Sequence, residues 1–150
     1  MATLLELNRR ANKIDTDKIF GNALQSNSKN VIQALQDQLY KGITAGYQGN
    51  EYSFRYNPKN KSYIEKKRSM NPSAGGKVDF KLTGSFYKGM TLIKENNTEF
   101  YINSSDEKTG LLKDRYGNNL MGLTKNTSSF VGERYIKLAM QQGLRKILGI

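Results

Sequence analysis

Positively charged residues and tyrosines alternate in the middle of this sequence, a combination suited to binding phosphate. Tyr52, Tyr56 and Tyr63 stand before and between the cations. The six cations are Lys59, Lys61, Lys66, Lys67, Arg68 and Lys77. Lysine and arginine neutralise backbone phosphates, and aromatic rings stack on unpaired bases. The segment therefore predicts a polyanion partner. The alternative is that the tyrosines cover a small core and the cations are merely solvated.

The net charge is concentrated in the same region. The chain of 150 residues carries a net charge of +11. Residues 51–94 contain ten basic and three acidic side chains, a surplus of +7, whereas residues 1–50 (six and four) and 95–150 (eight and six) each contribute +2. Such a surplus favours partners with many negative charges, and nucleic acid is the first of these.

The composition excludes several catalytic classes. The sequence has no cysteine, no histidine and no tryptophan, which removes thiolate nucleophiles, Cys/His zinc sites and imidazole acid–base chemistry. Acidic residues are few, and their close pairs are Asp15 with Asp17 and Asp106 with Glu107. A metal-dependent nuclease needs carboxylates that converge in a cleft. We therefore expect no enzyme activity, no metal and no cofactor.

The length and hydropathy suit one folded domain outside a membrane. An apolar content of 37% over 150 residues is enough for a real core. The sequence has neither a signal-peptide pattern at its start nor an apolar run near the roughly 20 residues that a membrane span needs. We expect a protein that resides or is assembled in the cytosol.

The element that organises the chain spans residues 79–103. Thr83 is placed to cap a helical turn over residues 84–88, which stops at a glycine. Apolar and polar residues then alternate over 90–103, on both sides of Asn96–Asn97. Two alternating runs joined by an Asn-rich turn predict an antiparallel hairpin.

Helices are predicted around this hairpin from apolar spacing, such as the stripe of Val31, Leu35 and Leu39 at i, i+4 and i+8. They span about 30–46, 58–68 (capped by Asn57, with Pro58 in the first turn), 107–117 and 127–148. The predicted class is therefore α+β, a hairpin or small sheet packed by the long C-terminal helix and a second amphipathic helix. The last helix is expected to lie on the hairpin.

The N-terminal section is expected to lie outside that domain. Residues 1–29 contain one short helix that ends before Asp15, followed by a polar run over 21–29. We expect a peripheral helix or an extended N-terminal arm over residues 1–29, beside a single domain over residues 30–150.

Short motifs follow one another along residues 30–149. A basic helix runs from Asn57-Pro58 to Lys66-Lys67-Arg68, then come Leu82-Thr83-Gly84-Ser85-Phe86-Tyr87-Lys88-Gly89-Met90, the hairpin, and Met121-Gly122-Leu123 before the last helix. This order resembles the virion-morphogenesis or tail-completion proteins of tailed bacteriophages, in which a Thr-Gly motif follows a Lys/Arg-rich helix and leads into a hairpin.

The resemblance implies a non-enzymatic virion component at the head–tail junction, assembled in the host cytoplasm. Such a protein forms a ring of twelve or six copies around the DNA channel, next to portal, connector or tail proteins. A closed ring needs heterologous contacts, and a positive lumen suits DNA that passes without sequence readout. The six cations are then expected to face DNA or an acidic neighbouring ring. The residues expected between subunits are Thr83, Gly84, Phe86, Thr91, Ile93 and Tyr101.

A small basic nucleic-acid-binding protein is the alternative function. It predicts salt-dependent binding by the isolated monomer, whereas a ring subunit predicts weak monomer binding and a need for partner proteins. The sequence has no RNP aromatic pair, GXXG clamp or C2H2 spacing. The absence of these motifs favours the ring.

Overall fold

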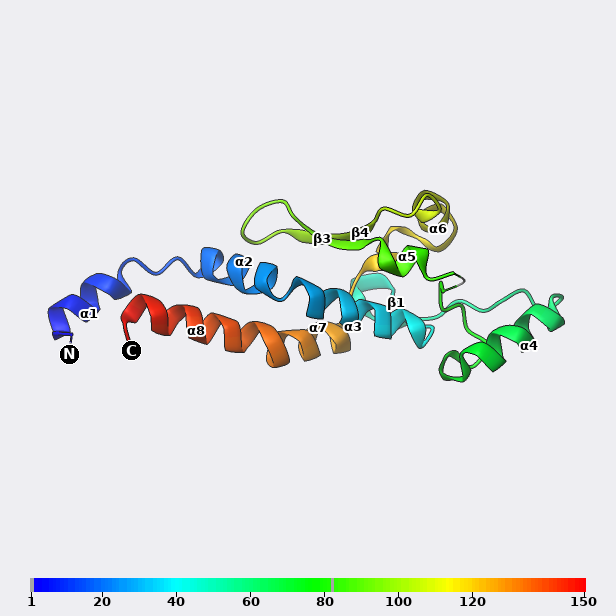
Figure 1. Ribbon diagram of the computed structural model, residues 1–150, viewed down its shortest axis with the longest axis horizontal. Helices are drawn as coiled ribbons and strands as arrows, with labels where there is room; N and C mark the ends of the chain where they lie inside the picture. Colours follow the sequence, from blue (N-terminus) through cyan, green and yellow to red (C-terminus); the bar gives the residue numbers. More distant parts are fainter. Residues whose placement is uncertain (1, 82) are drawn as a thin grey trace.

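The computed structural model describes residues 2–81 and 83–150 and has the predicted α+β class. Its α-helices are α1 (Leu4–Ala11), α2 (Thr16–Ser26), α3 (Ser28–Tyr40), α4 (Lys61–Met70), α5 (Ser85–Lys88), α6 (Thr109–Tyr116), α7 (Lys125–Val131) and α8 (Lys137–Leu148). Its strands are β1 (Thr44–Ala45), β2 (Glu51–Tyr52), β3 (Met90–Lys94) and β4 (Phe100–Ser104). Single-turn elements are η1 (Tyr47–Gly49), η2 (Pro72–Ala74), η3 (Asn118–Met121) and the π-helical η4 (Gly132–Ile136). The molecule is elongated, with α1 near one end and α4 at the other (Figure 1).

Helix α3 is the centre of the core. The predicted apolar stripe of Val31, Leu35 and Leu39 is buried. The helix ends at Tyr40, earlier than predicted, because the chain turns at Gly42 with a φ of 74° and enters β1. A positive φ costs glycine little, so Gly42 allows the chain to turn just after the helix ends.

The predicted hairpin is confirmed. Strands β3 and β4 pair antiparallel over five residues each, and Met90 lies opposite Ser104. In the turn, Asn96 Oδ1 accepts the backbone N–H groups of Thr98 and Glu99 at 2.9 and 2.8 Å. This side chain replaces backbone partners that a tight turn leaves free.

The C-terminal helix is continuous from α7 through η4 into α8. Thr124 caps it by accepting the N–H of Thr127 at 3.2 Å. The expectation that this helix lies on the hairpin is wrong. Helix α7 packs on α3, and α8 packs on α1 and α2, whereas the hairpin rests on α3 through β3. In Figure 1 the α2–α3 layer lies between the hairpin and the C-terminal helix, so both bury their apolar sides against it.

The N-terminal section contains a helix that the sequence reading missed. The polar run over residues 21–29, which we expected to lie outside the domain, falls in α2 and the start of α3. Asp15 Oδ1 accepts a backbone N–H at 3.0 Å and caps α2, whose Ile19 and Ala23 are buried. A Cβ on Gly143 would lie 3.3 Å from Ile19 Cγ2, so α8 approaches α2 closely at this glycine. Ala23 belongs to the main core cluster, whereas α1 buries no residue.

Two other helices begin later than predicted. Helix α4 starts at Lys61 because Asn57 Oδ1 accepts the N–H of Lys59 at 3.0 Å and holds these residues in a preceding turn. Helix α6 begins at Thr109 and ends at Tyr116, with the predicted Gly117 in the C-terminal capping position. No helix in residues 2–81 and 83–150 has both the length and the hydropathy that a bilayer crossing requires.

Candidate functional site

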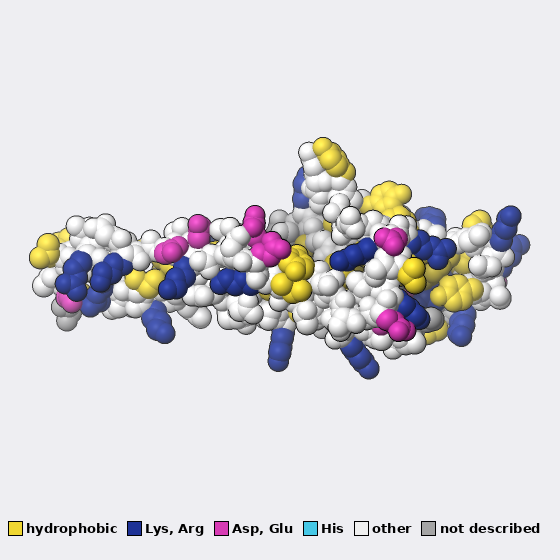
Figure 2. All heavy atoms as spheres, turned by 90° about the horizontal axis from the view of Figure 1, so that it is seen from above, with side chains coloured by type: hydrophobic (Ala, Val, Ile, Leu, Met, Phe, Trp, Pro, Cys, Tyr) yellow, Lys and Arg dark blue, Asp and Glu magenta, His cyan; other side chains and the backbone are white. Residues whose placement is uncertain are grey.

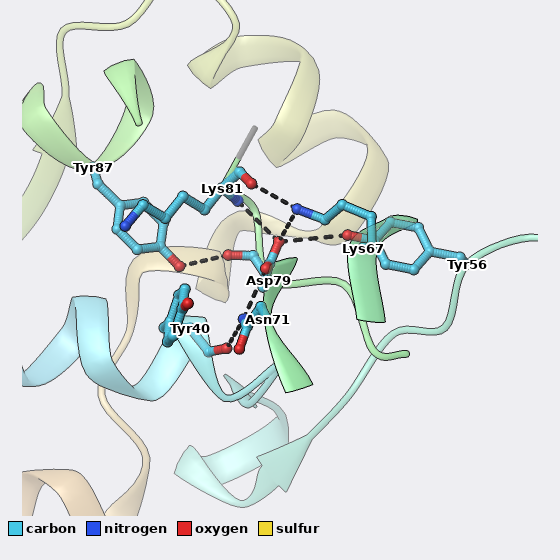
Figure 3. Close-up of polar contacts among 7 residues, drawn as sticks. All are labelled: Tyr40, Tyr56, Lys67, Asn71, Asp79, Lys81 and Tyr87. Carbon is cyan, nitrogen blue, oxygen red and sulfur yellow. Dashed lines mark hydrogen bonds and ion pairs between the residues drawn. The ribbon is translucent and has the colours of Figure 1, made fainter. Parts of the chain in front are cut away.

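Lys67 and Asp79 form a buried ion pair at the end of the molecule that carries α4. Lys67 Nζ lies 2.8 Å from Asp79 Oδ1, and the two side chains are only 5% and 3% exposed. The same ammonium group donates to the carbonyl oxygen of Lys81 at 2.6 Å (Figure 3). Our expectation that Lys67 faces DNA or an acidic neighbouring ring is therefore wrong, because this lysine points inward from α4 to neutralise a buried carboxylate.

Further donors complete the network around Asp79. Asn71 Nδ2 donates to Asp79 Oδ2 at 2.8 Å and to the carbonyl oxygen of Tyr40 at 2.6 Å. Asp79 Oδ1 also accepts the backbone N–H of Lys81 at 3.1 Å and the hydroxyl of Tyr56 at 3.4 Å. Buried charges persist only when they are paired and hydrogen-bonded. The network therefore joins the end of α3, helix α4 and the segment before α5.

Two tyrosines in this network remain protonated. The Tyr87 hydroxyl donates to the backbone carbonyl of Asp79. Burial, reinforced by the negative charge of Asp79, raises the pKa of both Tyr56 and Tyr87 well above the ordinary tyrosine value. Both hydroxyls therefore serve as donors and are not poised to act as bases.

The network also holds a strained residue. Phe80, between Asp79 and Lys81, has a φ of 56°, a left-handed conformation that is uncommon for a bulky side chain. Its ring packs edge-on against Tyr116 of α6, with ring centroids 4.9 Å apart. The bonds of Asp79 and Lys81 fix the backbone on both sides of it. The cluster therefore positions α4 and α6. Its polar groups bond to one another, except for the buried Asn71 Oδ1, which has no hydrogen-bond partner among the described residues.

A cavity of about 300 Å³ borders this network. Its lining includes the rings of Tyr56, Tyr63, Phe80 and Tyr116 and the cations Lys81, Lys108 and Arg115. Asp106 also lines it, and hydrogen bonds with Ser85 and with the backbone N–H of Lys108 lower the pKa of its carboxyl group. Lys81, Lys108 and Arg115 were not among the cations predicted from the sequence. The cavity therefore adds three cations to the predicted set.

The remaining predicted cations lie at the surface. Lys59, Lys61, Lys66 and Arg68 are exposed, and Lys77 is half-buried. None of the five forms an ion pair with another described residue. Figure 2 shows lysine and arginine side chains at the end of the molecule where α4 lies. We call this set, together with Lys81, Lys108 and Arg115, the basic end.

The residues predicted between subunits fall into two groups. Thr91 and Tyr101 are exposed and Ile93 is half-buried, and Ile93 lies opposite Tyr101 across the hairpin. Phe86 is 5% exposed and part of this chain's own core, so its predicted contact with a neighbour is wrong.

The Thr-Gly motif is organised differently from the prediction. The residue in the capping position of α5 is Gly84, with a φ of 86°, and Thr83 Oγ1 accepts the N–H of Ser85 at 3.4 Å. A Cβ on Gly84 would meet no atom within 4 Å, so the backbone angle and not a close approach favours glycine. Leu82, which opens the motif, lies outside the described residues.

Asp79 and Asn71 are two residues of the network that the sequence analysis did not predict. Asp79 is the one acidic residue between residues 66 and 94, among seven basic residues (Lys66, Lys67, Arg68, Lys77, Lys81, Lys88, Lys94). That isolation was a usable signal for a paired, buried carboxylate. Asn71 stands in a loop-forming run, and nothing in its sequence context indicated burial.

Within the described residues no group of three or more acidic side chains is placed to hold a metal ion. Compared with known protein families, curated proteins and solved structures, the chain finds no match.

Proposed function

We propose that this protein is a structural virion subunit of a tailed phage that forms part of a ring around the DNA channel at the head–tail junction, with its basic end toward DNA. The motif order described above supports the family part of this proposal. The observation that carries the DNA-facing part is the set of exposed cations Lys59, Lys61, Lys66 and Arg68 on and just before α4, which form no ion pair with any described residue.

The position of α4 suits contact with a large polyanion. The helix lies at one extremity of the long axis, and Glu65 is its single acidic residue (Figure 1). Its outer cations can approach phosphates, because the ion pair of Lys67 holds the helix from its inner side. Contacts of lysine and arginine with phosphates are independent of sequence, as passage of packaged DNA requires.

Charge reversal tests the DNA-facing surface. The variant Lys59→Glu, Lys61→Glu, Lys66→Glu, Arg68→Glu is compared with the control variant Lys18→Glu, Lys29→Glu, Lys94→Glu, Arg134→Glu, which changes four exposed cations elsewhere. Binding to a duplex of arbitrary sequence is measured by fluorescence anisotropy across a salt series. We expect the log–log salt slope of the α4 variant to fall by about 0.9 for each phosphate that it no longer neutralises. Equal reductions in both variants would overturn the assignment of α4.

The ring is tested separately by electron microscopy of the purified chain, alone and with the portal and tail proteins of the same phage. We expect rings or incorporation into particles. Tight, salt-dependent binding by a monomer that never joins particles would instead identify a small nucleic-acid-binding protein.

A further inference from the structure

Helix α1 exposes leucines that no other described residue covers. Leu4 is 88% exposed and Leu5 is 82% exposed, and α1 buries none of its residues. The same helix and the turn after it carry Arg9, Arg10 and Lys13. An amphipathic helix gains most of its stability from packing its apolar face, so α1 has a face that remains to be packed.

A groove on α3 and α7 has the opposite character. It has a volume of about 360 Å³ and is lined in part by Asp37, Glu51, Ile43 and Phe130. Phe130 is an apolar side chain at the surface, 54% exposed. Among the described residues the two carboxylates accept only from neutral amides, at 2.9 and 3.0 Å, and form no ion pair. The groove therefore offers apolar surface beside two carboxylates that form no ion pair with a described residue.

Charge distinguishes this groove from two other cavities. The cavity at the basic end has four cations and two carboxylates in its lining, and a cavity beneath the hairpin has one cation, Lys113. The groove on α3 and α7 has two carboxylates against one cation, Lys41. In a protein with a net charge of +11, it is the one of these three that attracts a basic apolar helix.

We propose that α1 of one copy of this chain docks into the α3–α7 groove of a second copy. The leucines of α1 would cover Phe130 and its surroundings, and Arg9 and Lys13 would face Asp37 and Glu51. Such a contact joins two different surfaces, so each copy donates one helix and receives one. The inference rests on the proposed function and deepens it in one respect, because repetition of a heterologous contact around an axis closes a ring.

A second copy is required, because the chain's own α1 is held elsewhere. Arg10 Nη1 donates to the carbonyl oxygen of Leu148 at 2.9 Å, and α1 packs on α8. The groove lies on α3 and α7. In Figure 1, α1 lies past the end of α2 that is farther from these two helices.

Cysteine cross-linking tests this contact directly, since the chain has no native cysteine. Asn8→Cys on α1 is mixed with Lys41→Cys in the groove, each on a chain of different tagged size, and the mixture is mildly oxidised. The control mixture pairs Asn8→Cys with Lys66→Cys on α4. All three positions are exposed. We expect several-fold more mixed disulfide dimer from the first pair, and equal yields would overturn the proposal.

Exchanging the charges across the proposed contact is a second test of it. Arg9→Glu with Lys13→Glu in the α1 donor should reduce the mixed dimer several-fold, and Asp37→Lys with Glu51→Lys in the receiving chain should restore it. A reduction without restoration would exclude the proposed pairing. DNA is absent from this assay, so its failure leaves the DNA-facing proposal standing, and weaker DNA binding after α4 reversal leaves the cross-link unaffected.

Discussion

The two ends of this molecule are built on different principles. The basic end contains a buried ion pair, several charge-assisted hydrogen bonds and two protonated tyrosines, which hold α4 in one position. Helix α1 at the other end buries no residue and leaves Leu4 and Leu5 in water. The comparison indicates that the contacts of the basic end lie within one chain, whereas α1 leaves apolar surface uncovered, which we propose a second copy packs.

The largest expected effect comes from removing one member of the ion pair. Lys67→Met leaves the Asp79 carboxylate buried without its cation, which typically costs about 3–5 kcal/mol. Urea unfolding monitored by circular dichroism measures this destabilisation. Lys66→Met, on the exposed side of the same helix, is the matched control and should change stability by less than about 0.5 kcal/mol. Similar values for the two variants would mean that the network does not fix the basic end.

This ion pair also marks the limit of the sequence reading. The α+β class, the hairpin and the α3 stripe followed from alternation and from i, i+4 spacing, because such patterns are local. The inward turn of Lys67 was not predictable in this way. Lys66, Lys67 and Arg68 are adjacent and chemically alike, and only the distant position of Asp79 decides which of them is buried. The same limitation applies to α8, because the layer that it covers depends on packing between remote segments.

The next effect concerns the tyrosine that closes the network. Tyr87→Phe removes the donor to the Asp79 carbonyl and should cost about 1–3 kcal/mol, since a buried acceptor is left unsatisfied. Tyr101→Phe, on the exposed side of the hairpin, is the control and should be nearly neutral. Urea unfolding of the two variants measures how much each hydroxyl contributes to the unfolding free energy.

Alkaline pH should weaken the same network. The folded-state pKa values of Tyr56 and Tyr87 are raised above the unfolded value of 10.0, so their contribution is complete below pH 10 and is lost as pH rises beyond it. Absorbance at 295 nm during a pH titration should show two of the nine tyrosines ionising only when the protein unfolds. Ionisation of all nine near pH 10 in the folded protein would contradict this assignment.

A smaller effect is expected in the Thr-Gly motif. Gly84→Ala places a Cβ on a residue with a φ of 86°, which should cost about 1–2 kcal/mol although the space is open. Gly110→Ala, in α6, also meets open space but is helical, so it should be neutral or stabilising by up to about 1 kcal/mol. Thermal or urea unfolding measures the change in unfolding free energy for both variants. Changes of opposite sign would show that the added Cβ costs free energy through the backbone conformation and not through a steric clash. Equal destabilisation would mean that the backbone angle is not what favours glycine at position 84.

The smallest expected change in unfolding free energy is in α1. It is also the most direct test of the difference between α1 and the basic end. Leu5→Ala should change the unfolding free energy of the dilute monomer by less than about 0.5 kcal/mol, since Leu5 is 82% exposed. Leu35→Ala, at a site with 0% exposure, should cost about 2–5 kcal/mol. At high protein concentration, Leu5→Ala should weaken self-association measured by sedimentation, because the leucine is then covered by a second copy. A large destabilisation of the dilute monomer would show that α1 is already packed within its own chain and would remove the distinction between the two ends.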